Sequence, residues 1–173
     1  MKTAIVIGSF DTFHNGHRDL LTYGLGIFDK LVVEISDDPK KKYWFTGEER
    51  REMLLLAMAD HAHRLEVHYN QNGLKDLGEI CRAHDAYHIL RGIKAGRTLD
   101  EELRLQNVYR FIMEETCGFA PEFVYKLTSD ADFRGSSIVK IYADQREILG
   151  KLVPEVLVES IYARGKEVNA RES

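Results

Sequence analysis

A chain of 173 residues, of which 44% are hydrophobic and 30% charged, has an ordinary globular composition and is long enough to bury a sizeable core. Its formal net charge of -4 argues against a nucleic-acid-binding protein, which would carry a strongly basic face. No apolar stretch reaches the length of a membrane span, and the first apolar run is too short for a signal peptide, so we expect a cytoplasmic protein with no nucleic-acid or membrane partner. The two cysteines, Cys81 and Cys117, fit no paired metal spacing, so we expect buried free thiols.

Short apolar runs alternate along the chain with longer segments of helical period. The apolar runs predict five strands, over Thr3–Ile7, Lys30–Ile35, Arg64–His68, Tyr87–Leu90 and Glu122–Leu127. The helical segments are predicted over Gly16–Ile27, Gly47–Ala59, Leu74–Ala83, Leu99–Glu115, Ser136–Ala143 and Pro154–Ala163. Because parallel strands need crossover connections that cover both faces of a sheet, this alternation predicts an α/β fold with a doubly wound, parallel five-stranded sheet and helices on both faces. No repeat or linker divides the chain, so we expect a single domain over residues 1–173.

Two glycines and two histidines follow the first predicted strand, in the stretch IGSFDTFHNGH. In a doubly wound sheet, ligands bind at the carboxyl ends of the strands, and Asn15-Gly16 opens a helix whose first amides carry partial positive charge. His14 and His17 are three residues apart, so both imidazoles would face one ligand. This pattern favours a phosphate site, with a metal-binding pair or a plain capped turn as alternatives.

Two other groups of polar residues favour solvated surfaces. His61, His63 and His68 span a helix end and a strand, where an exposed edge is expected rather than a set of metal ligands. The pair Arg50-Arg51 follows two glutamates and is expected on an exposed helix face with local ion pairs.

The residues Gly8-Ser9-Phe10-Asp11 followed by His14-Asn15-Gly16-His17 resemble the nucleotidyltransferase signature, in which a G-[TS]-F-D turn precedes [HT]-x-G-H. Further segments resemble those of phosphopantetheine adenylyltransferases: PKKKYWFTGEERREML, RGIKAGRTLDEELRLQ, FRGSSIVK and LVPE. The resemblance implies a Rossmann-like fold and transfer of an adenylyl group from ATP to 4'-phosphopantetheine, giving dephospho-coenzyme A and pyrophosphate. It also implies Mg2+ with the ATP and a homo-oligomer, a hexamer.

The same resemblance implies roles for individual residues. His17 would stabilise the transition state at the α-phosphate, Lys41 would hold the acceptor phosphate, and Arg91 would lie against the pantetheine substrate. Contacts with ATP are implied for Ser9, Phe10, His14, His17, Gly92, Ile93, Lys94, Glu102, Arg134, Gly135, Ser136 and Ser137. Contacts with the acceptor are implied for Ser9, Lys41, Leu77 and Arg91. No protein ligand to a metal is expected.

Several positions depart from the family pattern. His14 stands where phosphopantetheine enzymes usually have threonine and is the cytidylyltransferase form, Lys94 replaces an arginine, and Arg134-Gly135 interrupts a serine-rich turn. The alternatives are therefore a cytidylyltransferase-like or other nucleotidyltransferase with a different phosphorylated acceptor, or a non-catalytic nucleotide-binding protein. Arg134 either compensates for Lys94 beside the β- and γ-phosphates or points to solvent.

Overall fold

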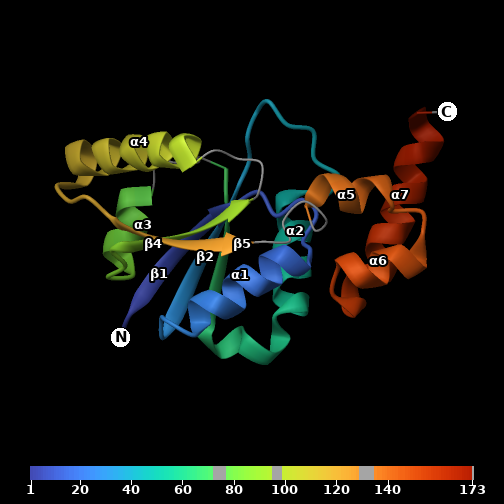
Figure 1. The fold of residues 1–173 in the computed structure, drawn as a ribbon, viewed down its shortest axis with the longest axis horizontal. Coiled ribbons are helices and arrows are strands. Elements are labelled where there is room, and N and C mark those ends of the chain that lie inside the picture. Colours follow the sequence, from blue (N-terminus) through green and yellow to red (C-terminus); the bar gives the residue numbers. More distant parts are fainter. Residues whose placement is uncertain (72–76, 95–98, 129–134, 173) are drawn as a thin grey trace.

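The computed structural model of the chain describes residues 1–71, 77–94, 99–128 and 135–172. Within them, one parallel sheet of five strands has the order β3-β2-β1-β4-β5 (Figure 1). The strands are β1 (Thr3–Gly8), β2 (Lys30–Ser36), β3 (Leu65–Asn70), β4 (His88–Lys94) and β5 (Glu122–Thr128). Since the strand order reverses between β1 and β4, the predicted doubly wound α/β fold is confirmed.

Helices cover both faces of this sheet (Figure 1). On one face, α1 (Asn15–Leu25) and α2 (Gly47–Ala57) bury leucines and Met53 against Val6 and its neighbours. On the other, α3 (Leu77–Ala83) and α4 (Leu99–Cys117) pack on Ile5 and Val32. The remaining helices extend the first core beyond α2, and they are α5 (Ser136–Ile141), α6 (Arg146–Leu152) and α7 (Val158–Glu172). Two 3-10 turns lie at Ala59–Arg64, before β3, and at Glu155–Leu157, before α7.

The largest differences from the sequence-based prediction are in β4, in α6 and in α7, which continues nine residues past the predicted end at Ala163. Strand β4 continues four residues past Leu90, because β5 supplies register partners from Arg91↔Tyr125 to Lys94↔Thr128 that the polar end of the strand did not indicate. Helix α6 was not predicted, since it has only seven residues and buries only two leucines, which leaves a weak helical pattern. The start of the expected helix over Leu74–Ala83 lies outside the described residues.

We call the split between β1 and β4 the crevice, because both strands continue beyond their last paired residues. Their pairing ends at Val6↔Leu90, whereas β1 stays paired with β2 as far as Gly8↔Ile35. Beyond this point β1 therefore stays paired with β2, while β4 stays paired with β5. This split lies at the carboxyl end of the sheet, where ligands of doubly wound proteins bind.

Arg50 joins three segments beside this split, although an exposed position was expected. Its side chain is only 1% exposed. Nη1 donates to the carbonyl of Ser9 at 2.8 Å, Nε donates to those of Phe45 at 3.1 Å and Thr46 at 3.2 Å, and Nη2 lies 2.5 Å from Asp37 Oδ1. The prediction of an exposed face was wrong for Arg50, because Ser9 and Asp37 come from distant segments that fold over the α2 N-terminus, whereas Arg51 is exposed beside Glu48 as expected.

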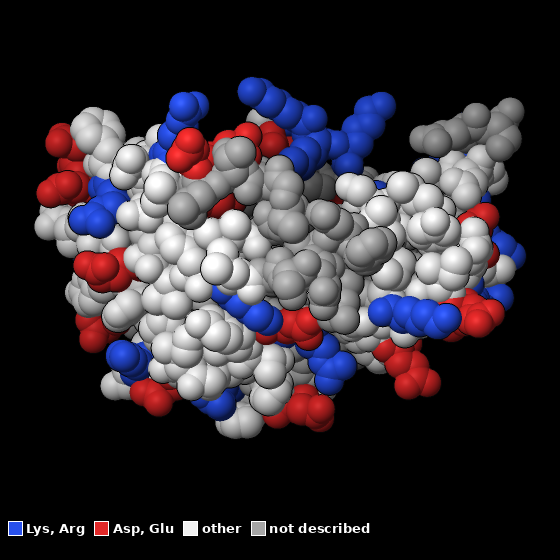
Figure 2. Space-filling view, viewed as in Figure 1, with Lys and Arg blue, Asp and Glu red and all other residues white. Residues whose placement is uncertain are grey.

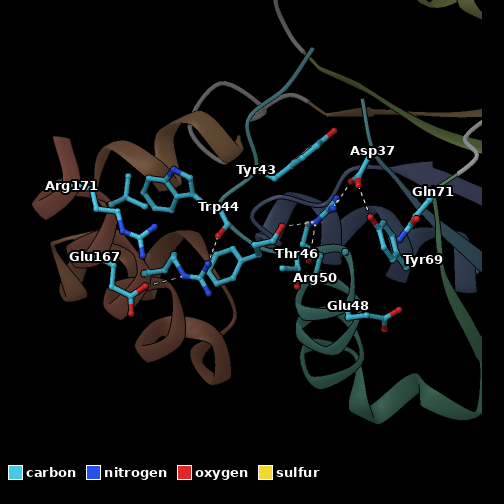
Figure 3. Close-up of a pocket in the computed structure, with 14 residues that line it drawn as sticks. Asp37, Tyr43, Trp44, Thr46, Glu48, Arg50, Tyr69, Gln71, Glu167 and Arg171 are labelled. Atoms are coloured by element: carbon cyan, nitrogen blue, oxygen red, sulfur yellow. Dashed lines mark hydrogen bonds and ion pairs between the residues drawn. The ribbon is translucent and has the colours of Figure 1, made fainter. Parts of the chain in front are cut away.

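Aromatic rings enclose the same guanidinium group (Figure 3). Its carbon lies 4.4 Å from the ring centroid of Tyr43 and 5.7 Å from that of Tyr69, whose hydroxyl also donates to Asp37. Burial would raise the pKa of Asp37, but the hydrogen bonds from Tyr69 and Arg50 outweigh it and hold that pKa below its ordinary value. The pair is thus ionised and held in one geometry.

The N-terminus of α2 has a second set of fixed contacts. Thr46 and Glu49 form a reciprocal capping box, in which each side chain accepts from the other's backbone amide. Arg164 of α7 donates to the Trp44 carbonyl and to Glu49, each at 2.5 Å. The C-terminal helix therefore stabilises the segment that precedes α2.

Charges of both signs are interspersed over the face seen in Figure 2, with a group of basic side chains along its upper edge. Across the described ranges, no helix is both long and apolar enough to span a membrane. Cys81 is buried, and this burial raises the pKa of its thiol to about 12, whereas Cys117 is only partly buried. Both thiols are free.

Replacing Arg50 should destabilise the protein more than replacing its neighbour. Arg50→Met leaves the Ser9, Phe45 and Thr46 carbonyls and the half-buried Asp37 carboxylate without their donor, so we expect a loss of about 2–4 kcal/mol in the free energy of unfolding, measured by urea denaturation. Arg51→Met is the matched control. Its side chain is 40% exposed and donates to the Val67 carbonyl, so about 1 kcal/mol is expected. Equal losses in the two variants would contradict the role given to Arg50.

Candidate active site

Asp11 connects the turn after β1 to two other elements. Its carboxylate, in a residue only 5% exposed, accepts the backbone amides of Trp44 at 3.1 Å and Phe45 at 3.1 Å. Lys140 of α5 places its Nζ 2.5 Å from Oδ2. The sequence analysis gave Asp11 no role, although an acidic residue in a turn directly after a buried strand is a signal that could have indicated one. It holds the turn, the segment before α2 and α5 in one arrangement.

His14 and His17 form a reciprocal cap at the start of α1. The backbone amide of His17 donates to His14 Nδ1 at 3.3 Å, and that of His14 donates to His17 Nδ1 at 3.4 Å. The two rings stack with centroids 3.7 Å apart. His14 is 2% exposed and His17 is half-buried. His14 is the buried N-cap beneath His17, and the expectation that both imidazoles face a ligand stays a prediction.

Two phenylalanines complete the surroundings of His17. The ring centroids of Phe10 and Phe13 lie 4.9 and 5.6 Å from that of His17. Phe10 adopts a positive φ of 52° and is 2% exposed, with its ring so close to Gly8 that a Cβ there would lie 3.0 Å from it. Because the ring of Phe10 is buried against Gly8 and His17, the expected contact of this residue with ATP would be made by its backbone.

Lys41 lies in the loop between β2 and α2, which follows the carboxyl end of the sheet. Its side chain is 59% exposed, and its Nζ lies 3.8 Å from Asp38 Oδ2, a contact too long and too exposed to hold it firmly. Ser9 is half-buried at the end of β1, where its carbonyl accepts from Arg50. The loop thus carries an exposed, weakly paired cation.

Arg91 and Glu102 pair with each other across β4 and α4. Arg91 Nη2 and Nε lie 3.0 and 3.2 Å from Glu102 Oε2, and the side chains are 14% and 2% exposed. Arg91 was expected to follow its strand; instead it lies within β4 and has the same side-chain direction as Ile89, toward α4. Burial raises the pKa of the nearby Tyr109. The Glu102 carboxylate therefore holds the Arg91 guanidinium group in place, one residue beyond the last β1–β4 pair at Leu90.

The other residues expected beside the nucleotide occupy varied positions. Ile93 is 8% exposed, whereas Gly92 is partly exposed and faces Leu20 of α1. Lys94 ends β4, and its side chain is not among those described. Arg134 lies outside the described residues, so its two alternatives remain open.

The start of α5 lies close to the turn after β1. Gly135 is the N-cap, Ser136 Oγ donates to the Thr12 carbonyl at 3.3 Å, and Ser137 is exposed. Leu77, expected to contact the acceptor, is 3% exposed and packs with Val32 in the core beneath α3. Its side chain belongs to the core because the sheet face, rather than the crevice, lies beneath that helix.

A pocket of about 570 Å3 lies beside these residues rather than among them (Figure 3). It is lined by Asp37, Tyr43, Trp44, Phe45, Thr46, Gly47, Glu48, Arg50, Tyr69, Gln71, Arg164, Glu167, Val168 and Arg171. None of the expected site residues is in this lining. Arg50 connects the two regions, since it lines the pocket and also donates to Ser9.

Comparison with known proteins identifies the family. Residues 5–141 match the family model described as cytidylyltransferase-like. The chain is 33% identical over 168 residues to a phosphopantetheine adenylyltransferase of Janthinobacterium sp. (strain Marseille), covering 95% of this chain and 100% of the relative. It is 32% identical over 167 residues to that of Herminiimonas arsenicoxydans, covering 95% and 98%.

A solved structure supports the fold alone. The Plasmodium falciparum nicotinic acid mononucleotide adenylyltransferase complexed with NaAD superposes with a TM-score of 0.66 at 13% identity, covering 93% of this chain and 95% of that one. The Rossmann-like expectation is therefore confirmed. The family model, the two full-length relatives and the capped histidine motif agree. The chain therefore belongs to the phosphopantetheine adenylyltransferase family of cytidylyltransferase-like nucleotidyltransferases.

Proposed function

We propose that the chain transfers an adenylyl group from ATP to 4'-phosphopantetheine, giving dephospho-coenzyme A and pyrophosphate. An oxygen of the acceptor phosphate attacks the α-phosphorus of ATP, and the bond from that phosphorus to the oxygen bridging the β-phosphate breaks. This transfer requires no covalent enzyme intermediate. It requires an aligned nucleophile and compensation for the negative charge that develops on phosphate oxygens.

The position of His17 is the observation that supports this reaction most directly. It stands at the N-terminus of α1, beside the split between β1 and β4, and its Nδ1 accepts the His14 amide. Because Nδ1 is an acceptor, a neutral ring carries its proton on Nε2 and can donate it in a hydrogen bond to an α-phosphate oxygen. The helix N-terminus adds partial positive charge at the same place.

The remaining residues suit positioning roles. The exposed and weakly paired Lys41 can reach an acceptor phosphate, whereas Arg91, fixed by Glu102, offers a rigid cation at the crevice. The proposed place of the β- and γ-phosphates is the start of α5, where Ser136 and Ser137 supply amides and hydroxyls. Ser9 lies between these groups at the end of β1.

Magnesium would enter with the nucleotide, on phosphate oxygens, and would neutralise part of the triphosphate charge. Of the described carboxylates beside the crevice, Asp11 accepts two backbone amides and pairs with Lys140, and Glu102 pairs with Arg91. Both are therefore committed to cations or amides of the protein. This donor set fits an ion that arrives on ATP better than one held by a protein carboxylate cage.

We also propose that the chain forms a homo-oligomer. Helix α4 exposes Leu103, Val108 and Phe111, which are 40%, 48% and 65% accessible. An apolar surface of this kind on a long helix is typical of subunit interfaces.

Substrate choice is tested by following pyrophosphate release with purified protein, magnesium and paired substrates. ATP with 4'-phosphopantetheine should give dephospho-coenzyme A and pyrophosphate, and CTP in place of ATP should give far less. The cytidylyltransferase form of the motif, with His14, makes CTP the matched control. Brisk release with CTP, or with a different phosphorylated acceptor only, would contradict the proposed substrates.

Two substitutions separate the chemistry of His17 from its capping role. In His17→Asn the amide oxygen can replace Nδ1 in the cap but no donor replaces Nε2, so turnover should fall about 100-fold or more with little change in stability. In His17→Ala the donor and the cap are both lost, so turnover should fall as far and about 0.5–2 kcal/mol of stability should be lost as well. Steady-state kinetics and thermal unfolding measure the two effects. If turnover follows stability in both variants, His17 acts only as a cap.

Assembly is tested by light scattering on the purified chain. The unmodified protein should have a mass several times 19.9 kDa, and Phe111→Asp should lower it because a carboxylate would be buried in the apolar contact. Glu101→Asp is the control for a mild change on the same helix. A monomeric unmodified chain would contradict the proposal.

A further inference from the structure

A group of metal-ligating side chains lies at the β3 edge of the sheet, apart from the crevice. Glu66 and His68 come from β3 and His84 follows α3, and one ligand atom from each lies within 4.8 Å of the others. His68 Nε2 is 3.0 Å from Glu66 Oε1, and His84 Nδ1 is 3.6 Å from Glu66 Oε2. The sequence analysis grouped His68 with His61 and His63, but the fold instead places it beside a histidine sixteen residues away.

Ordinary secondary structure brings the three residues together. Glu66 and His68 are two residues apart in a strand and so share one face of the sheet. Helix α3 packs on that face, and the backbone amide of His84 donates to the Ile80 carbonyl at its C-terminal end. A cation at this end of the helix is favoured by the carbonyl groups that point there.

The carboxylate of Glu66 is charged and oriented. Lys30 Nζ lies 2.5 Å from Glu66 Oε2, in an ion pair that joins β2 to β3. The contact fixes one oxygen and leaves Oε1 directed toward His68. A partner that holds the second oxygen of a ligating carboxylate is a common feature of metal sites.

We propose that Glu66, His68 and His84 bind a zinc ion that links β3 to the end of α3. Two imidazole nitrogens and one carboxylate oxygen suit Zn2+, whereas Mg2+ prefers oxygen ligands, so this site is distinct from the magnesium that accompanies ATP. Bonds of about 2.0–2.1 Å in a tetrahedron place ligand atoms about 3.3 Å apart. The ligand atoms now lie within 4.8 Å of one another, so small side-chain rotations are needed to reach this spacing. Such rotations are open to Glu66, His68 and His84, whose side chains are 34%, 42% and 20% exposed. Water would occupy the fourth position.

Zinc titration of the untagged, chelator-treated chain tests this site. We expect one zinc ion per chain, measured by calorimetry, and visible tetrahedral absorption bands when Co2+ replaces it. His68→Gln and His84→Gln should each weaken binding by at least about 100-fold, because even changes outside the ligand set cost about 10–100-fold. Zinc should also raise the thermal midpoint of the unmodified chain and not that of these two variants.

His63→Gln is the matched control, because His63 is exposed on the neighbouring 3-10 turn. It should bind zinc as the unmodified chain does. The thermal midpoint of each metal-free variant shows that it is folded. The proposal is overturned if the chain binds no zinc, if His68→Gln and His84→Gln bind it unchanged, or if His17→Asn alone abolishes binding, which would place the ion at the start of α1.

Discussion

The buried carboxylate of Asp11 is the constraint on which the arrangement of the candidate active site depends. It accepts the amides of Trp44 and Phe45 and pairs with Lys140, so the turn after β1, the segment before α2 and α5 meet at one group. A carboxylate in this position is stable only while those donors stay in place. The turn that carries His17 is therefore set by contacts from segments more than thirty residues away.

Arg50 complements this carboxylate from the side of α2. It holds the Ser9 carbonyl, while Asp37 and two tyrosine rings hold its guanidinium group. Both charged groups fix the turn after β1. Asp11 does so through its own side chain, and Arg50 does so by donating to the backbone carbonyl of Ser9. The His17 imidazole in this turn is half-buried, stacked on His14 and flanked by Phe10 and Phe13.

The sequence predicted the sheet well because β1 and the Leu-Val-Val half of β2 are apolar runs, which parallel strands buried on both faces require. The glycine and histidine motif also indicated where the site lies. The roles of His14 and Arg50 could not be predicted in the same way, because a side chain's burial depends on neighbours that only folding brings near. The same holds for His68 and His84, whose common partner Glu66 is visible only once β3 and α3 pack together.

A crystal structure with bound ATP or dephospho-coenzyme A tests the central claim most directly. The account predicts that the phosphates lie at the split between β1 and β4, with an oxygen of the α-phosphate about 2.7–3.2 Å from His17 Nε2. The turn held by Asp11 and Arg50 should keep its contacts in that complex. A nucleotide in the pocket between Tyr43 and Tyr69, with its phosphates away from His17, would contradict the account.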